Sequence, residues 1–430
     1  MIHSYYIWTI GCQMNKADSE RLESAMGQMG LSSTDSPMNA DVIVLNSCVV
    51  RQSAEDKVTG LLTSLKPLKN TARNPILGLM GCMVGPNQDT LKKKFPYVDV
   101  FMQPQQYEPL IDVLGEKLGV DPEGCVGPLS AKPDVTAYIP IIHGCDKFCS
   151  FCIIPYRRGR EISRTVDEVV FETKQLTQKG VKEITLLGQN VDSYGHDLPG
   201  KPDLGDLLTA LNELENLERI RFLTSHPNDM SDHIIDSVAN LNKVCEHINL
   251  PFQAGDDTVL NNMRRGYTNY HYRDLIDKIR SRIPNVSLST DLIVGFCGET
   301  DVQFEKSLQL IEDIRFDKLH AASYSTRKGT ISDRMMTDDV PLETKKKRLE
   351  IIETVQKDIL TESNASLVGE TFEILVEGRK RGKWFGRNRN DKLIYFQSEA
   401  ARKGEMINVI IVDSSPWSLS GTKIPEQVSL

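Results

Sequence analysis

The chain has 430 residues, of which 40% are hydrophobic and 26% charged. This is ordinary globular composition, with room for two or three domains. The formal net charge of −8 argues against indiscriminate nucleic-acid binding, so any RNA site must be a local basic patch. No run is long enough to span a membrane, and the apolar stretch from Tyr5 to Ile10 is too short for a signal peptide. We expect a cytoplasmic protein whose cysteines are metal ligands and buried thiols rather than disulfides.

The first 115 residues alternate between apolar runs and helical patterns. This alternation predicts a doubly wound parallel sheet with helices on both faces. Asp18 or Ser19 is the expected N-cap of the first helix, and Gly30 is expected to stop it. The expected strands are 5–10, 42–45 and 76–80, with helices after the first and near 54–65.

Three cysteines, Cys12, Cys48 and Cys82, each follow the end of one of these strands by two or three residues. Ligand sites in open α/β sheets form outside the carboxyl ends of the strands, so we expect the three thiols to converge and hold a metal cluster. The alternative is three unrelated buried cysteines, because cysteine is among the most buried residue types.

Glycine and proline concentrate between residues 118 and 133, which predicts a linker. Cys125 lies in it without a partner at ligand spacing, and we interpret it as a bystander. Six strand and helix units then predict a parallel sheet curled into a partial (β/α)6 barrel, with its chemistry at the carboxyl ends of the strands. The expected strands are 137–142, 184–187, 220–224, 247–250, 286–294 and 319–324.

A short loop after the first of these strands carries Cys145, Cys149 and Cys152 at C-x3-C-x2-C spacing. A closed structural zinc site needs a fourth ligand, and no fourth Cys or His follows at a usable distance. Three thiolates can instead hold a 4Fe-4S cluster that keeps one iron open. The spacing resembles that of radical SAM enzymes, in which the open iron binds S-adenosylmethionine (SAM). Zinc, or a mere group of buried thiols, remains the alternative.

Several other strand ends in this region are polar or rich in glycine, so each is a candidate contact to the cofactor. A turn-forming glycine or a satisfied polar cap is the alternative for any one of them. His226 is a candidate general base, although a lone histidine is more often simply hydrogen bonded. The candidate cofactor-binding residues are Gln189, Ser225, Asp291 and Gly295.

After a charged amphipathic helix over 341–363, whose 345–348 run we expect to be solvated, short alternating strands predict a small OB-like β-barrel. A loop over 378–392 is expected between its first two strands. This stretch contains seven Lys or Arg and one Asp, with two aromatic residues interleaved. Single-stranded RNA binding typically combines cations, which contact phosphates, with aromatic rings, which stack on bases. The alternative is a basic loop that only keeps the protein soluble, and the adjacent aromatic residues make this interpretation the weaker one. The candidate RNA-binding residues are Arg379, Lys380, Arg381, Lys383, Trp384 and Phe385.

With these motifs together, nearly the whole chain resembles the radical SAM methylthiotransferase family. The resemblance rests on the segments 9–15, 46–51, 144–161, 187–190 and 224–227, and on a C-terminal region similar to a TRAM domain. It implies an N-terminal cluster domain over 1–117, a linker over 118–133, a radical SAM core over 134–362 and a TRAM domain over 364–430. Gly11-Cys-Gln-Met-Asn15 is the form typical of the branch that acts on dimethylallyladenosine at tRNA position 37.

The resemblance implies two 4Fe-4S clusters and SAM as cofactors. Cys145, Cys149 and Cys152 would bind the cluster that cleaves SAM, and Cys12, Cys48 and Cys82 the cluster that holds the sulfur to be inserted. The implied partners of this monomer are the tRNA anticodon stem-loop, an electron donor and a sulfur source. Alternatives are the branches that act on a ribosomal protein or on threonylcarbamoyladenosine, and, remotely, a non-catalytic metal-containing RNA-binding protein. His143, Cys297, Thr326 and Lys328 depart from the family pattern, but none is a cluster ligand.

Overall fold

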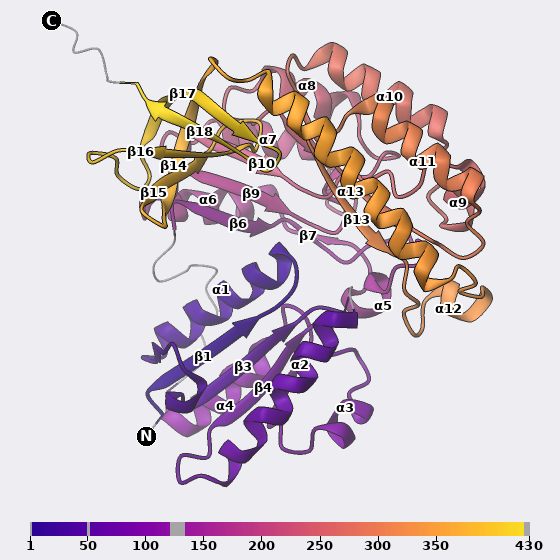
Figure 1. Ribbon diagram of the computed structural model, residues 1–430. Helices are drawn as coiled ribbons and strands as arrows, with labels where there is room; N and C mark the ends of the chain where they lie inside the picture. The colour runs from indigo at the N-terminus through magenta and orange to yellow at the C-terminus, as the bar shows by residue number, and fades with distance from the viewer. Residues whose placement is uncertain (1, 50–51, 121–133, 425–430) are drawn as a thin grey trace, which may run out of the picture.

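The computed structural model describes residues 2–49, 52–120 and 134–424. It consists of an N-terminal sheet, a central partial barrel and a small C-terminal barrel, which Figure 1 shows in indigo, in magenta to orange, and in yellow. Most of the predicted linker, with Cys125, lies outside the described residues, so the domain boundaries stay a prediction. Within the described residues, no helix combines the length and apolar character that a membrane span requires.

The N-terminal sheet has five parallel strands in the order β2-β1-β3-β4-β5. Val42 and Val44 pack with α1 and α4 on one face, whereas Ile43 and Leu45 pack with α2 on the other. This division explains the unbroken apolar run, and it confirms the doubly wound sheet. The elements are β1 (Ser4–Thr9), α1 (Gln13–Gln28), β2 (Ser32–Ser33), β3 (Val42–Ser47), α2 (Gln52–Leu65), β4 (Ile76–Gly81), α3 (Asp89–Lys94), β5 (Val100–Met102) and α4 (Glu108–Leu118), with 3-10 turns at Pro37–Asn39 and Lys66–Asn70.

The predicted cap of α1 is wrong. The helix begins directly after Cys12, which is its N-cap, so Asp18 and Ser19 lie inside it. Both are buried, and each has a partner from another element: Asp18 pairs with Arg158, and the Ser19 hydroxyl accepts from Asn46. Their polar side chains therefore connect the helix to its surroundings instead of starting it. Gly30, with φ +86°, follows the end of the helix as expected.

The central region contains two parallel three-stranded sheets, β6-β9-β10 and β11-β12-β13. Ile220 forms a parallel bridge with Val244, and the Ser225 N–H donates to the Asn249 carbonyl, so the two sheets continue into one six-stranded partial barrel. Its helices share one hydrophobic core with the outer face of the strands. The strands are β6 (Thr136–Pro140), β9 (Glu183–Leu187), β10 (Arg219–Phe222), β11 (His247–Asn249), β12 (Ser287–Val294) and β13 (Lys318–Ser323), and a separate short pair is β7 (Ile142–His143) and β8 (Ile162–Ser163).

The helices of this region follow the strands in the order that a β/α barrel requires (Figure 1). Thr165, Asp203 and Thr300 cap three of them through capping boxes, which fix where each helix begins. The helices are α5 (Ile154–Arg158), α6 (Val166–Gln178), α7 (Leu204–Asn212), α8 (Asp232–Asn240), α9 (Asp257–Asn262), α10 (Asn269–Arg282), α11 (Asp301–Ile314), α12 (Ile331–Met335) and α13 (Leu342–Ala365), with a 3-10 turn at Val191–Ser193.

The expectation of a solvated 345–348 face on α13 is wrong for two of its four residues. Lys345 and Arg348 are only 3% and 4% exposed. Lys345 pairs with Asp338 and donates to the Tyr324 carbonyl, and Arg348 pairs with Glu299 and Asp301. Lys345 and Arg348 lie one helical turn apart, and both face the central barrel. Carboxylates of the central region pair with them, so α13 packs along the barrel through ion pairs as well as apolar contacts.

The C-terminal region is a closed five-stranded barrel in the order β14-β15-β16-β18-β17, as an OB-like fold requires. The predicted loop over 378–392 is wrong in part, because residues 378–387 form the β14–β15 hairpin. Its tight turn is at Arg381 and Gly382, both with positive φ. The strands are β14 (Thr371–Lys380), β15 (Lys383–Arg387), β16 (Leu393–Gln397), β17 (Met406–Ser415) and β18 (Ser418–Lys423).

Candidate functional site: two cysteine triads on one cavity

The N-terminal triad lies at the carboxyl edge of the N-terminal sheet. Cys12 precedes α1, Cys48 follows β3 directly, and Cys82 follows β4 directly. All three line the same cavity, so the structure brings together the thiols that the strand positions predicted.

Two glycines allow this convergence. Gly11 has φ +144°, and a Cβ there would lie 2.6 Å from the Cβ of Cys48. Gly81 has φ +94°, and a Cβ there would lie 2.4 Å from the Asn46 side-chain oxygen. The Asn15 side chain donates to the Asn46 side chain at 2.9 Å, and Asn46 donates back to the Asn15 carbonyl at 2.7 Å. These buried amides hold the start of α1, with Cys12, against the end of β3, with Cys48.

The second triad lies on the loop between β7 and β8, and the antiparallel pairing of these strands closes the loop at its base. The Cys145 N–H donates to the Gly159 carbonyl at 3.1 Å. Gly144 has φ +73°, and a Cβ there would lie only 2.0 Å from the Arg160 carbonyl, so this position requires glycine.

The middle of this loop is bound to the central barrel. The Ser150 hydroxyl and N–H donate to the carbonyls of Asn262 and Met263, at 2.7 and 3.0 Å. The Cys152 N–H donates to the Cys149 carbonyl, which turns the chain between the last two cysteines. The three thiols thus lie on a well-supported loop at the mouth of the barrel.

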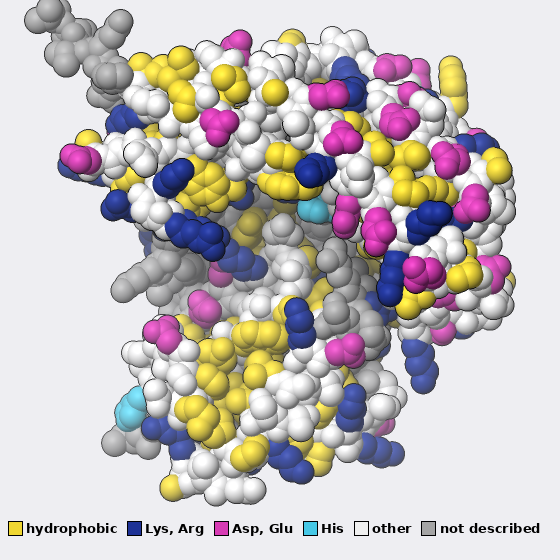
Figure 2. All heavy atoms as spheres, in the orientation of Figure 1, with side chains coloured by type: hydrophobic (Ala, Val, Ile, Leu, Met, Phe, Trp, Pro, Cys, Tyr) yellow, Lys and Arg dark blue, Asp and Glu magenta, His cyan; other side chains and the backbone are white. Residues whose placement is uncertain are grey.

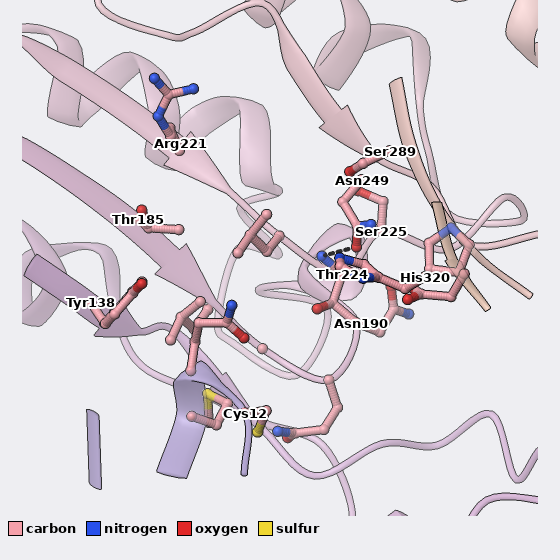
Figure 3. Close-up of a pocket in the computed structure, with 18 of the residues that line it drawn as sticks. Cys12, Tyr138, Thr185, Asn190, Arg221, Thr224, Ser225, Asn249, Ser289 and His320 are labelled. Carbon is pink, nitrogen blue, oxygen red and sulfur yellow. Dashed lines mark hydrogen bonds between the residues drawn. The ribbon is translucent and has the colours of Figure 1, made fainter. Parts of the chain in front are cut away.

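Both triads line a single cavity of about 750 Å³ that extends into the central barrel. Figure 3 shows Cys12 at the start of α1 together with Tyr138, Asn190 and Ser225 of the central barrel. All four residues line the cavity. Two sets of thiols from separate domains therefore line one cavity, where groups bound to them could react with the same substrate.

Each triad has a buried arginine against one of its sulfurs. Arg158 Nε donates to Cys82 Sγ, and Arg265 Nη1 donates to Cys149 Sγ, both at 3.3 Å. Burial raises the pKa of the Cys82 thiol, and it raises the pKa values of Cys145 and Cys152 to about 12. Thiolates in this cavity therefore need positive charge beyond the arginines, which a bound metal would supply.

The spacing of the sulfurs favours a polynuclear cluster over a single zinc ion. Four thiolates at about 2.3 Å from one zinc lie roughly 3.8 Å from one another. In the described part of the chain, neither triad brings all its sulfurs within 4.8 Å of one another. A cluster of several irons, each with its own cysteine, accommodates a wider spacing. The residues of both triads thus fit iron-sulfur clusters.

The polar strand ends meet at the same cavity. Gln189, Ser225 and Asp291 line it, as do Gln253 and His226. Three buried acceptor or donor atoms there have no hydrogen-bond partner among the described residues, namely Gln189 Oε1, Asn190 Oδ1 and His226 Nε2. Buried polar atoms are normally paired, so these atoms indicate a polar ligand.

Gly295 is the one candidate cofactor-binding residue that does not line the cavity. It packs instead against Lys345, because a Cβ at position 295 would lie 2.4 Å from the Lys345 side chain. His226 is held neutral, because burial and then Arg265 lower its pKa to about 2. A neutral imidazole with a free nitrogen is suited to hydrogen bonding with a ligand, and it is a poor general base.

Part of the cavity lining is an apolar wall. Met14, from α1, packs with Leu187, Tyr138 and Leu223 from the central barrel, and all four line the cavity. This wall joins the N-terminal and central domains beside Cys12. The cavity therefore offers both polar and apolar surface to whatever enters it.

The predicted RNA-binding residues lie on the β14–β15 hairpin. Arg379, Lys380, Arg381 and Lys383 are exposed, whereas Trp384 and Phe385 are half-buried. Trp384 Nε1 donates to the Ser398 carbonyl, and Phe385 lines the large cavity. The other basic residues of the stretch have partners: Arg387 pairs with Glu377 and Asp391, Arg389 with Glu246, and Lys392 with Asp317. Figure 2 shows Lys and Arg side chains gathered on the C-terminal barrel.

Sequence reasoning missed both arginines that donate to thiols. Arg158 lies in the motif that follows the second triad, but nothing in its spacing points to Cys82. None of the residues that depart from the family pattern is among those that line the cavity. Cys297 is buried in the central core, Thr326 and Lys328 are exposed, and His143 bonds Gln105.

Family models match three parts of the chain: the radical SAM superfamily at residues 139–311, the uncharacterized protein family UPF0004 at 4–103, and the TRAM domain at 365–424. A tRNA-2-methylthio-N(6)-dimethylallyladenosine synthase of Dehalococcoides mccartyi is 49% identical over 415 residues, which cover 96% of this chain and 97% of the relative. The chain belongs to this methylthiotransferase family. A synthase of the same name from Herpetosiphon aurantiacus is 46% identical, over 99% of this chain and 98% of the relative.

Solved structures resemble this methylthiotransferase in fold. The radical S-adenosylmethionine methyltransferase TsrM of Kitasatospora setae aligns with a TM-score of 0.56 at 13% identity, over 77% of each chain. The cobalamin-dependent S-adenosylmethionine radical enzyme OxsB aligns with a TM-score of 0.52 at 13% identity, over 83% of this chain and 56% of the other. At this identity the likeness concerns the fold alone.

Proposed function

We propose that this protein is a tRNA methylthiotransferase that inserts a methylthio group at C2 of dimethylallyladenosine at position 37, beside the anticodon. The observation that carries the proposal is the convergence of two cysteine triads, from two domains, on one cavity. A C2–H group is neither acidic nor electrophilic enough for acid-base chemistry. Activating it and delivering sulfur to it are separate tasks, which two metal sites facing one substrate can divide.

Cys145, Cys149 and Cys152 would hold one 4Fe-4S cluster together with SAM, and Cys12, Cys48 and Cys82 would hold the second. When bound, the first supplies the electron that splits SAM into a 5'-deoxyadenosyl radical, and the second supplies the sulfur. Gln189, Asn190 and His226, each with a buried atom that has no partner among the described residues, are the side chains that would orient SAM. Asp192 supports this end of the cavity, since it accepts from the Ser225 hydroxyl at 2.8 Å.

The cavity and the hairpin also suit the substrate. The apolar wall of Met14, Tyr138, Leu187 and Leu223 offers a surface for a dimethylallyl group, which a purely polar cavity would not. The exposed cations of the β14–β15 hairpin can meet the phosphates of the anticodon stem-loop, and Phe385 extends from the hairpin into the cavity. We further propose that the protein acts as a monomer in the cytoplasm, with an electron donor and a source of replacement sulfur as partners.

The deciding experiment expresses the protein in a host that lacks methylthiolated tRNA and analyses digested tRNA nucleosides by mass spectrometry. The expected product is 2-methylthio-dimethylallyladenosine. Prenylated tRNA should be modified, whereas tRNA without the dimethylallyl group should not. Modification of threonylcarbamoyladenosine or of a ribosomal protein in place of this nucleoside would contradict the proposed substrate.

The division between the triads is tested in reconstituted protein. A variant with Ala at Cys12, Cys48 and Cys82 should still form 5'-deoxyadenosine under strong reductant, but no methylthio product. A variant with Ala at Cys145, Cys149 and Cys152 should form no 5'-deoxyadenosine. Folding of each is checked by circular dichroism, because loss of a cluster can unfold the domain that holds it. Methylthiolated adenosine from the folded N-terminal variant would refute the division.

A further inference from the structure

Arg158 connects the two triads. It ends α5, on the loop that carries Cys145, Cys149 and Cys152, yet its guanidinium lies in the N-terminal domain. Nε donates to Cys82 Sγ at 3.3 Å, and Nη2 donates to the Asp18 carboxylate at 3.2 Å. The side chains of Arg158 and Asp18 are only 2% and 0% exposed. A single buried side chain thus joins the loop of one triad to a sulfur of the other.

The third nitrogen of this guanidinium is available to a ligand. Arg158 Nη1 is buried and has no hydrogen-bond partner among the described residues, although Arg158 lines the large cavity. A buried cationic N–H without a partner costs free energy, so a ligand that accepts from it would stabilise the site. Asp18 also holds the guanidinium in place through Nη2, so Nε stays directed at Cys82 while Nη1 has no partner among the described residues.

We propose that Arg158 is a positioning residue for the sulfur-bearing cluster, which it holds by charge-assisted N–H···S hydrogen bonds and joins to the loop that holds SAM. This inference rests on the proposed function. The ligand of Nη1 would be an anionic sulfur of the cluster held by Cys12, Cys48 and Cys82. Hydrogen bonds to the sulfurs of an iron-sulfur cluster stabilise its reduced, more negative state, so Arg158 raises the reduction potential of this cluster.

Arg265 is the matched residue on the other triad. Its Nη1 donates to Cys149 Sγ at 3.3 Å, the same distance as the Arg158 contact, and its side chain is also buried. The two arginines come from different elements and touch different triads. Each should therefore affect the potential of its own cluster and leave the other unchanged.

The experiment measures the midpoint potentials of both clusters by redox titration with electron paramagnetic resonance, in reconstituted wild-type, Arg158→Gln, Arg158→Lys and Arg265→Lys proteins. Gln can donate one hydrogen bond but carries no charge, and Lys keeps the charge without the planar donor pair. We expect a lower potential for the N-terminal cluster in both Arg158 variants, with the larger shift for Gln, and no shift for the SAM cluster. In Arg265→Lys, the potential of the SAM cluster should fall and that of the N-terminal cluster should not change.

A second readout is the amount of 5'-deoxyadenosine formed per methylthio product. It should rise several-fold in Arg158→Lys, because radical formation continues while the sulfur is misplaced. Arg160→Gln is the control, since Arg160 is 70% exposed, lies two residues away on the same loop and pairs with Asp146. It should leave both potentials and the ratio unchanged.

Two results would overturn the inference. One is an unchanged potential of the N-terminal cluster in Arg158 variants that retain wild-type iron content. The other is an equal shift of both clusters, which would mean that Arg158 only holds the domains together. If Arg158→Gln does not retain the N-terminal cluster, the potential measured in Arg158→Lys tests the inference. The redox result stands even if wild-type protein makes no methylthio product, so failure of the inference and failure of the proposed function are distinguishable.

Discussion

Arg221, inside the central barrel, donates a 2.6 Å hydrogen bond from Nη2 to the backbone carbonyl of Asn388, in the C-terminal barrel. Arg219, two residues earlier on β10, donates from Nη1 to the Arg387 carbonyl at 2.7 Å. Both arginines are buried, and Glu183 lies beside them in the central barrel. One strand of the barrel that lines the large cavity thus holds the end of the basic hairpin and the residue that follows it.

Replacing Arg219 with Met should loosen the C-terminal barrel from the central one. It removes the donors to the carbonyls of Arg387 and Glu373 and leaves Glu183 with less compensation. Glu183 keeps its 3.0 Å ion pair with Arg221, so the cost should stay below the roughly 3–5 kcal/mol of a buried charge left without any partner. The expected result is a lower thermal unfolding midpoint and faster backbone hydrogen exchange over residues 387–389. Unchanged exchange there would show that the arginine does not hold the two barrels together.

Replacing Arg379, Lys380, Arg381 and Lys383 with Gln should weaken tRNA binding and reduce its salt dependence. Each phosphate contact contributes roughly 0.7–0.9 to the slope of log affinity against log salt, so the slope should fall by about three. Cleavage of SAM without tRNA should not change. The charge-matched control replaces Lys92, Lys93, Lys346 and Lys347, which are exposed on other elements. An equal fall in slope for both variants would mean that net charge, rather than the hairpin, binds the tRNA.

Three cysteines should be dispensable for the clusters. Cys245 and Cys297 are buried, and neither lines the cavity that the two triads share. Cys125 lies outside the described residues. With Ala at Cys125, Cys245 and Cys297, reconstituted protein should keep the wild-type iron content, about eight irons for two cubane clusters. Loss of three or four irons per chain, measured with a colorimetric chelator, would assign a ligand to one of these thiols.

Asp192 should make the stability of the folded protein fall as the pH rises. Burial raises the pKa of this carboxyl to about 7, from an ordinary value of 3.8. Between these values the folded state binds a proton that the unfolded state has released, so its contribution is present at low pH and is lost as the pH rises through 7. For one proton the slope is about 1.4 kcal/mol per pH unit.

In an Asp192→Asn variant, the side chain at position 192 has no proton to release in this pH range. The variant's free energy of unfolding relative to that of wild-type protein should therefore rise between pH 5 and 7 and level off above 7. Chemical denaturation of cluster-free protein, with both proteins in the same buffers, measures this difference. Parallel stability profiles for the two proteins would show that Asp192 keeps an ordinary pKa.

The sequence by itself determined what depends on local spacing and periodicity. The C-x3-C-x2-C loop, the positions of Cys12, Cys48 and Cys82 after strands, and the alternation of strands and helices are all readable along the chain. Parallel strands place their carboxyl ends at one edge, so the convergence of the N-terminal thiols could be predicted. The resemblance to methylthiotransferases then supplied the assignment of the two triads, which residue patterns alone left open.

Only the tertiary structure decided which charged groups are buried against one another. Arg158 contacts a cysteine 76 residues away, and Lys345 and Arg348 lie in a run that local pattern makes solvent-facing. The basic stretch over 378–392 divides in the same way: four of its cations stay exposed, while Arg387, Arg389 and Lys392 pair with carboxylates. A charged side chain is stable inside a protein only beside a partner, and the partner's position depends on how distant segments pack. No spacing along the chain encodes it.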